Sequence, residues 1–435
     1  MIRTKAFIMK KYPLTLLLAL TTLLFGWASL AQSGIPATVW AWRNQLVLLS
    51  GIQLMAVMSA AMLLATRAGW LESRLGGLDQ MYRLHKRLGI SSGVLLAAHW
   101  LIKLSPPLLL ALGAEPLMRH GHHAGFSLIG LAREVGSWSA YAMLALVALA
   151  LLRLVPYGVF RKLHTLFAPL FLLGAFHGAI LLPRSFWPTP IGILFALMML
   201  AGSVAAGLVL AGRIGKSRLH RGQVVSVTPL PGELLEVVCQ MDAGWPGHRA
   251  GQFARVTFDA AEGAHPFTIA NGDNAARQLR FIIKRLGDYT GKLANILQSG
   301  HPVQIEGPYG RFLPASKPQR QAWVAGGIGV TPFLAWLDNF ARQGRKLDQV
   351  DFYYCVQAEP HAVQLAQLRA QCQATGVRLH LLASERGDRL QADMLPVVDS
   401  VWFCGPTAFG SALAEGLARR RGKKPSFHAE AFSMR

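Results

Sequence analysis

The sequence predicts an all-α membrane domain of six helices, followed by an antiparallel β-barrel domain and a parallel-sheet α/β domain. The 435-residue chain is 52% hydrophobic and only 15% charged, which is too apolar for an ordinary soluble protein. Its long apolar runs end near Arg213, and short apolar segments then alternate with turns and later with helical patterns. We expect domains at 1–215, 216–315 and 316–435.

Six segments are long and apolar enough to cross a bilayer. They are Pro13–Ala31, Leu46–Ala65, Leu84–Leu104, Trp138–Leu154, Leu163–Leu182 and Pro188–Ala211. Lys and Arg cluster before the first span, in alternate loops and after the sixth, so the positive-inside rule places both termini in the cytoplasm. The first segment also fits a cleaved signal peptide, because a basic start and an apolar core precede Ser29-Leu30-Ala31. Its removal would leave five spans with unchanged orientation.

The net charge of +22 does not indicate nucleic-acid binding, because no Lys/Arg tract is interleaved with aromatic residues and many basic residues flank apolar segments. Anionic lipid headgroups and haem propionates are the partners that this pattern favours. The cysteines lie far apart in the second half and form neither CxxC nor an iron–sulfur ligand run. This usage is typical of a reducing, cytoplasmic compartment.

Four histidines form two pairs within the apolar segments. His85 and His99 lie 14 positions apart, and His164 and His177 lie 13 apart, so each pair spans roughly 20 Å of helix axis. Two such helices side by side offer two His–His slots, which suit two stacked b-type haems; the alternative is buried core histidines. Fourteen residues return to nearly the same helix face, whereas thirteen miss it by roughly 140°. Either Pro169 kinks the second helix, or the haems approach its different faces.

Three other features of this half have open roles. Lys103 lies one turn beyond His99, where it holds a haem propionate, stabilises an anionic acceptor or product, or snorkels to the interface. Phe171, midway along the second histidine segment, either separates the haems or packs in the core. A histidine cluster in the loop before the fourth span binds a metal or belongs to an ordinary polar loop; it comprises His120, His122 and His123.

The second half alternates short β-type runs with turns, which is typical of a small antiparallel barrel. These runs are Gln223–Val227, Leu234–Val238, Phe253–Phe258, Leu279–Lys284 and Val303–Glu306. Strands then alternate with helices, as in a parallel sheet with crossover helices. The segments are Gln321–Ala325, Phe333–Arg342, Val350–Cys355, Val363–Cys372, Leu379–Ala383, Ser400–Phe403 and Ala408–Arg419.

Two loops of the parallel sheet have phosphate-binding chemistry. Ala325-Gly326-Gly327-Ile328-Gly329-Val330-Thr331-Pro332 joins the first strand to its helix. Its glycines let backbone N–H groups approach a pyrophosphate, and the helix N-terminus favours negative charge. Cys404-Gly405-Pro406 ends a later strand, which predicts Cys404 near the reactive ring of a dinucleotide. The alternative role of Cys404 is that of a small buried hydrophobe.

With these features the chain resembles the ferric reductase and NADPH oxidase superfamily over nearly its whole length. The similar motifs are the His-x13-His and His-x12-His pairs, the two nucleotide loops, and the following segments: His265-Pro266-Phe267-Thr268, Lys284-Arg285-Leu286-Gly287-Asp288-Tyr289-Thr290, Glu306-Gly307-Pro308-Tyr309-Gly310 and the C-terminal Phe427-His428-Ala429-Glu430-Ala431-Phe432. The resemblance implies FAD in the barrel domain and NAD(P)H in the α/β domain.

The resemblance also implies residue roles. It pairs His85 with His164 at an inner haem and His99 with His177 at an outer one. Flavin contacts fall to His265, Pro266, Phe267, Thr268, Lys284, Gly287 and Thr290, and nucleotide contacts to Gly326, Gly327, Gly329, Thr331, Pro332, Gly405 and Pro406. Phe432 would stack on the flavin, with Glu430 and Cys404 beside the nicotinamide. Ser384 and Arg386 resemble residues that bind a 2′-phosphate, which favours NADPH over NADH.

These expectations describe a multi-pass oxidoreductase of a bacterial inner membrane. It would pass electrons from cytoplasmic NAD(P)H through FAD and two haems b to an outer acceptor, a ferric chelate first among the candidates. The alternatives are a superoxide-producing oxidase, with O2 as acceptor, and a subunit that donates electrons to a partner redox protein. Lys103 stands where the animal oxidases have a histidine, so their oxygen-reducing site does not transfer directly.

Overall fold

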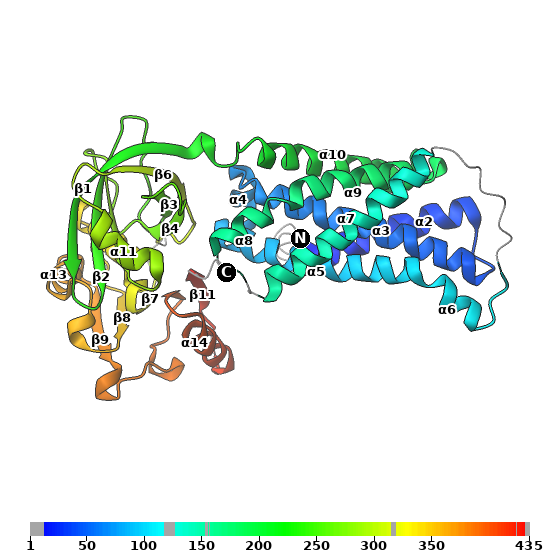
Figure 1. Cartoon of the computed structure of the whole chain (residues 1–435). Coiled ribbons are helices and arrows are strands. Elements are labelled where there is room, and N and C mark those ends of the chain that lie inside the picture. The colour runs from blue at the N-terminus through cyan, green and yellow to red at the C-terminus, as the bar shows by residue number, and fades with distance from the viewer. Residues whose placement is uncertain are drawn as a thin grey trace. The chain divides into compact units, whose positions relative to one another are not determined.

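The computed structural model describes residues 13–116, 127–152, 155, 157–314, 319–422 and 424–430 (Figure 1). The predicted histidine cluster at His120, His122 and His123 and the predicted flavin-stacking Phe432 lie outside these residues. The chain divides into two compact units. Apart from residues 77–79, the first runs to Ile214, and the second begins at Gly215.

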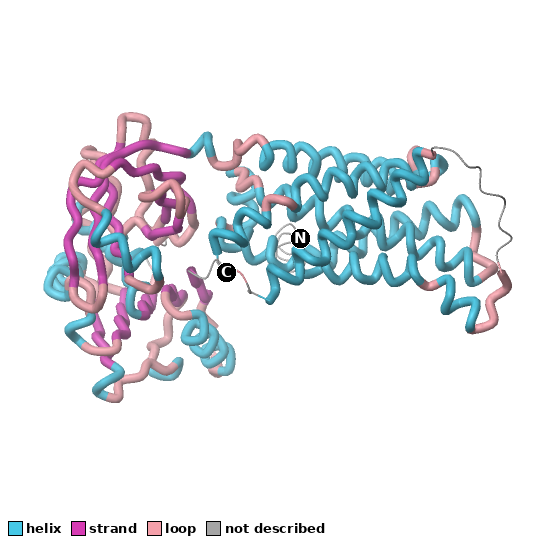
Figure 2. The backbone as a smooth tube through the Cα atoms, in the orientation of Figure 1, coloured by secondary structure: helices cyan, strands magenta, loops and turns pink. Residues whose placement is uncertain are grey.

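The first unit is helical, whereas the strands lie in the second (Figure 2). Its helices are α2 (Pro13–Ser33), α3 (Val39–Ala65), α4 (Gly69–Leu75), α5 (Leu78–Leu104), α6 (Pro106–Ala111), α7 (Leu128–Leu152), α8 (Tyr157–His164), α9 (Phe167–Leu181) and α10 (Pro190–Leu210). Among the described residues, five stretches are long and apolar enough to cross a membrane. They are α2, α3, α7, α10 and Gly158–Leu181. The remaining predicted span, Leu84–Leu104, lies on α5, which is 27 residues long but less apolar.

Two helices begin earlier than their apolar runs predict. The Thr38 side chain accepts a hydrogen bond from the Ala41 N–H at 3.2 Å, which fixes the start of α3 at Val39. Helix α7 begins at Leu128, so the exposed Arg133 and Glu134 lie inside its first turns. Charged residues near a helix end lower the local hydropathy without ending the helix.

The second histidine segment is broken in the turn that precedes Pro169. Helix α8 ends at His164 and α9 begins at Phe167. Between them the Thr165 and Leu166 N–H groups donate to carbonyls only three residues back. A proline ring clashes with the carbonyl four residues before it, which here belongs to Thr165. The break changes the angle between the directions of His164 and His177 around the helix axis. The 13-residue spacing therefore no longer implies that the two residues lie on different helix faces.

Phe171 belongs to the packed core of the first unit. It is fully buried, and a Cβ on Gly202 of α10 would lie 2.3 Å from its ring. Helix α10 packs along α3 and α9, and α9 packs along α7. Of the two roles considered for Phe171, the structure shows core packing.

The second unit begins with a six-stranded antiparallel sheet, in the order β4-β3-β6-β1-β2-β5. The strands are β1 (Leu219–Leu230), β2 (Leu234–Met241), β3 (Phe253–Thr257), β4 (His265–Thr268), β5 (Gln278–Lys284) and β6 (Pro302–Tyr309). An isolated bridge joins Ile269, just beyond β4, to Phe281 of β5. Closure into a barrel stays a prediction. Helix α11 (Asp288–Ile296), which the sequence did not reveal, follows β5.

A five-stranded parallel sheet follows, in the order β11-β10-β7-β8-β9. Its strands are β7 (Gln321–Gly326), β8 (Val350–Val356), β9 (Arg378–Ala383), β10 (Ser400–Cys404) and β11 (Ser426–Glu430). The connecting helices are α12 (Thr331–Arg342), α13 (Leu365–Thr375) and α14 (Thr407–Arg419). Every residue of the central strand β7 is buried, so its following loop has a rigid base.

Candidate functional site

The four histidines meet in the two predicted pairs. The ring centroids of His85 and His164 are 5.9 Å apart, and those of His99 and His177 are 6.5 Å apart. Two imidazoles bonded to one metal at about 2.0 Å place their ring centroids about 6 Å apart. Both pairs therefore have the spacing that a shared haem iron requires.

Backbone and hydroxyl groups hold three of these rings by Nδ1. The His85 Nδ1–H donates to the Ala61 carbonyl of α3 at 3.0 Å, and the His177 Nδ1–H donates to the Ala132 carbonyl of α7 at 2.8 Å. A carbonyl only accepts, so Nδ1 carries the proton and Nε2 keeps its lone pair for a metal.

The third ring, that of His99, is held by Ser50, whose hydroxyl proton is donated to a backbone carbonyl. His99 Nδ1 lies 2.9 Å from Ser50 Oγ, and that hydroxyl donates to the Val47 carbonyl at 3.0 Å. Ser50 therefore accepts from Nδ1–H, and the Nε2 of His99 is left unprotonated. His164 differs, since its buried Nδ1 has no hydrogen-bond partner among the described residues.

Small residues on the neighbouring helices make room for the rings. A Cβ on Gly136 of α7 would lie 2.0 Å from His177 Nδ1, and one on Gly51 of α3 would lie 3.3 Å from His99 Cε1. No helix in the described part of the unit follows α5 as closely as α10 follows α3.

Three helices bring polar side chains to the end of the unit that holds His99 and His177. The Lys103 ammonium donates to the Ser137 hydroxyl of α7. Arg43 of α3 donates to the Lys103 carbonyl at 2.8 Å and to Ser105 Oγ at 3.1 Å. Lys103 and Arg43 thus place two cations at this end of the unit.

The HPFT motif forms strand β4 and leaves a buried hydroxyl without a partner. Thr268 is buried, and its Oγ1 has no hydrogen bond among the described residues. The His265 ring stacks on Tyr289 with centroids 4.2 Å apart. A buried polar group without a partner is costly, so the Thr268 hydroxyl fits a site that a bound group completes.

The second flavin motif lies at the N-terminus of α11. Thr290 Oγ1 accepts from the Leu286 N–H at 2.9 Å and donates to the Gly287 carbonyl at 3.4 Å, which orders the loop. Lys284 at the end of β5 is exposed. The helix N-terminus and the lysine fit a phosphate group. Pro266 and Phe267 lie on β4 beside Thr268.

The two nucleotide loops of the parallel sheet are in contact. A Cβ on Gly326 would lie 2.7 Å from Pro406, and one on Gly329 would lie 2.2 Å from the Cys404 carbonyl oxygen. Gly405 lies against Gly326, whereas Gly327 has positive φ and open space around its Cα. Thr331 and Pro332 begin α12 directly after this loop. The glycines thus allow a close approach of two backbones at the carboxyl ends of β7 and β10.

Cys404 and Glu430 are buried side by side where β10 and β11 end. They are register partners, and burial raises the pKa of both groups well above their ordinary values. The thiol is fully buried in the core, so it behaves as a protonated, packed side chain. Glu430 Oε2 has no hydrogen-bond partner among the described residues, and its Oε1 approaches Gly310 of the antiparallel sheet's last turn. A protonated Glu430 can donate a hydrogen bond there.

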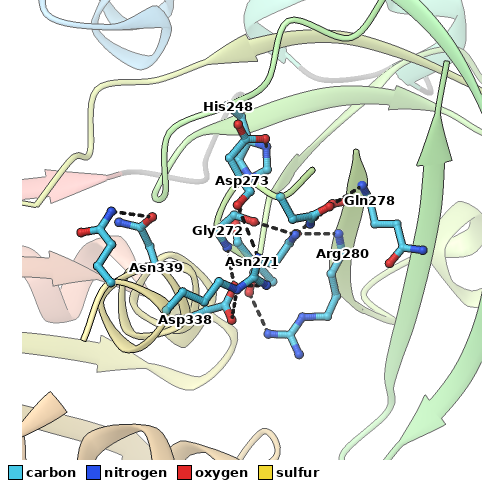
Figure 3. Close-up of polar contacts among 12 residues, drawn as sticks. His248, Asn271, Gly272, Asp273, Gln278, Arg280, Asp338 and Asn339 are labelled. Carbon is cyan, nitrogen blue, oxygen red and sulfur yellow. Dashed lines mark hydrogen bonds and ion pairs between the residues drawn. The ribbon is translucent and has the colours of Figure 1, made fainter. Parts of the chain in front are cut away.

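A polar network joins the antiparallel sheet to α12 of the parallel sheet (Figure 3). The Gly272 N–H donates to Asp338 Oδ2 at 2.8 Å, and the same oxygen pairs with Arg342 at 2.8 Å. The buried His248 ring lies between the Asn271 carbonyl, 2.9 Å from Nε2, and the Asp273 carboxylate, 3.4 Å from Nδ1. This network joins the segment after β4 to α12, the helix that follows the glycine-rich loop.

Several of these residues were not found from the sequence. Ser50, Ala61 and Ala132 act through a hydroxyl or backbone carbonyl and carry no sequence signal of their own. Gly136 had a weak signal, since small residues mark close helix contacts in membranes. Among the described residues, no three His, Cys, Asp or Glu side chains gather as a metal site.

Two family models match separate parts of the chain. Residues 50–175 match a model described as ferric reductase like transmembrane component, and residues 219–312 match an FAD-binding domain. The matches confirm the predicted resemblance. Residues 50–175 are thus similar to the transmembrane component of ferric reductases, and residues 219–312, which follow them, are similar to an FAD-binding domain.

Relatives of known role resemble shorter parts of the chain. The anthranilate 1,2-dioxygenase electron transfer component of Acinetobacter baylyi is 34% identical over 113 residues, which is 25% of this chain and 32% of that protein. The carnitine monooxygenase reductase subunit of Acinetobacter pittii is 28% identical over 31% of this chain and 43% of its own length. The chain therefore spans less than half of either relative.

One solved structure resembles most of the chain in fold. The flavohemoglobin of Malassezia yamatoensis, with bound FAD and heme, has a TM-score of 0.51 and 16% identity. The likeness covers 90% of this chain and 99% of that one. At this identity it shows a shared fold and no more.

Proposed function

We propose that the chain is a transmembrane oxidoreductase that carries electrons from cytoplasmic NAD(P)H through FAD and two b-type haems to an acceptor across a bacterial inner membrane. The observation that carries the proposal is the pair of histidine slots, with rings 5.9 and 6.5 Å apart. The distribution of Lys and Arg supports cytoplasmic termini. The proposed domains are 1–215, 216–315 and 316–435.

Bound flavin and haem would supply the change from two-electron to one-electron chemistry. The chain's residues hold and orient these groups. His85 with His164, and His99 with His177, would hold the two haems through their Nε2 atoms. The Thr268 hydroxyl would hydrogen-bond the flavin, and the α11 N-terminus would face its phosphates. Protonated Glu430 would donate a hydrogen bond beside the nicotinamide without adding charge there.

The acceptor that fits best is an anionic ferric chelate. Lys103 provides positive charge near the His99–His177 pair, and Arg43 adds a second cation beside Lys103; such charge attracts anions before electron transfer. Superoxide formation from O2 is the first alternative. In sealed vesicles, superoxide formed at the rate of NAD(P)H consumption would refute the ferric-chelate proposal.

A second candidate is electron donation to a partner redox protein. It is favoured by the similarity of part of the chain to an electron transfer component of a dioxygenase and to a reductase subunit of a monooxygenase. Rapid turnover of the purified chain with small acceptors would contradict this candidate.

The decisive experiment is an optical spectrum and haem assay of the His99→Leu variant. We expect loss of one haem by pyridine haemochrome, with flavin reduction by NAD(P)H intact. The control is Leu101→Ala, which changes an exposed side chain of the same helix. Unchanged haem content in His99→Leu would refute the ligand assignment.

A further inference from the structure

The edge of the parallel sheet that would receive the ribose of a dinucleotide carries carboxylates as well as arginines. In sheets of this type the phosphate loop follows one strand, and the adenosine ribose lies at the end of the next. Here the loop follows β7, and β8 ends at Val356, three residues before Glu359. The loop after β9 is tied to this one, because the Glu385 N–H donates to the Gln357 carbonyl at 3.0 Å.

Arg386, which the sequence assigned to a 2′-phosphate, is already paired with carboxylates. Its guanidinium lies 3.5 Å from Glu359 Oε2 and 3.5 Å from Asp388 Oδ2. Arg369 of α13 pairs with the other oxygen of Glu359 at 3.0 Å. Two cations are thus matched by two carboxylates, and the edge has no surplus positive charge from these groups.

The serine beside Arg386 is also directed elsewhere. Ser384 Oγ faces the Gln357 carbonyl at 3.4 Å. Asp388 is held in place, because its Oδ2 accepts from the Ala383 N–H at 3.1 Å at the end of β9. A phosphate at this position would meet a fixed carboxylate.

We propose that this chain prefers NADH to NADPH and that Glu359 is the residue that sets the preference. The inference rests on the proposed function, since it assumes a dinucleotide at this sheet edge. A carboxylate at the end of the second strand accepts hydrogen bonds from the ribose hydroxyls of NADH. A 2′-phosphate, with a charge of about −1.5 to −2, faces Glu359 and Asp388 instead. Arg386 would have to leave both to bind it.

We expect the preference for NADH to be moderate in size. The side chains of Glu359 and Arg386 are 42% and 54% exposed, so water and salt screen their charges. We therefore expect about a tenfold to hundredfold difference in affinity between the two nucleotides, a moderate value for like charges brought together. This reverses the NADPH preference expected from Ser384 and Arg386.

The test is calorimetric titration of the purified full chain with NAD⁺ and with NADP⁺. The wild type is expected to bind NAD⁺ about tenfold more tightly or better. Glu359→Gln should strengthen NADP⁺ binding and weaken NAD⁺ binding, so that the ratio approaches one. The matched control is Glu415→Gln on α14, an exposed glutamate paired with Arg419, which should keep the wild-type ratio.

Tighter NADP⁺ binding by the wild type, or a ratio unchanged by Glu359→Gln, would overturn the inference. Rapid-mixing measurement of flavin reduction by NADH and NADPH separates it from the proposed function. If the nucleotides bind in the expected ratio and neither reduces the flavin, the proposed function fails and the specificity stands. If NADPH reduces the flavin with the lower half-saturating concentration, the specificity fails and the proposed function stands.

Discussion

Replacing Gly136 with alanine tests whether α7 is shaped around the ring of His177. The new Cβ would lie 2.0 Å from Nδ1, 2.4 Å from Cε1 and 2.7 Å from Cγ, whereas ordinary contact begins at 3.4 Å. The shortfall exceeds an ångström, and the atoms it meets belong to a rigid ring. Either α7 and α9 separate, or the ring turns and loses its 2.8 Å bond to the Ala132 carbonyl.

Overpacking of this kind costs about 1–3 kcal/mol, and the lost hydrogen bond costs about 1 kcal/mol more. Under the proposed function the whole loss falls on one ligand pair, so haem affinity at that pair should drop by about thirtyfold to a thousandfold. Pyridine haemochrome assay of the purified variant should show one haem lost and the His85–His164 haem kept. Gly174→Ala on α9 is the control, because nothing lies within 4 Å of its Cβ. A Gly136→Ala protein with both haems and a wild-type spectrum would refute the reasoning.

Three further predictions concern the soluble half. Thr268→Val should weaken FAD binding about tenfold in a fluorescence titration, because the flavin would lose its hydrogen bond to the buried Thr268 hydroxyl. Thr268→Ser keeps a hydroxyl and should retain the affinity. Asp338→Ala removes the acceptor of the Gly272 N–H, so flavin reduction should slow while FAD affinity stays unchanged; equal rates would show that the network does not position the nucleotide loop. Burial raises the pKa of Glu430 above 4.5, so the folded state keeps a proton that the unfolded state releases. Stability should therefore fall as pH rises above about 4.5, the ordinary pKa of a glutamate. Glu430→Gln should flatten that fall in thermal unfolding.

The pairing of the histidines was predictable because helix geometry turns sequence spacing into position. His85 and His99 need one straight helix, and α5 provides it. The second pair needed Pro169 as well, since its ring explains the break after His164. The contact between the two glycine-rich loops followed from the parallel topology, which gathers the carboxyl ends of β7 and β10 at one edge.

Side-chain environment was less predictable than position. Arg386 has the residue type and place of a phosphate ligand, yet its charge is already matched by Glu359 and Asp388 from two different loops. Such matching arises only when the loops after β8 and β9 fold against each other. A local motif gives the residue type at a position, whereas the residues that pack against it in the fold determine whether its charge is already paired.

Helix α5 shows how polar functional residues lower the mean hydropathy of a membrane helix. It is as long as α3, and it holds His85 and His99, yet it is not among the five apolar stretches found in the described residues. Its ligands and the charged residues at its ends, Lys103 among them, lower its mean hydropathy. Polar residues persist in such a helix when bound groups and partner helices satisfy them. Under the proposed function, the span with the weakest membrane signal is therefore one of the two that carry the histidine ligands.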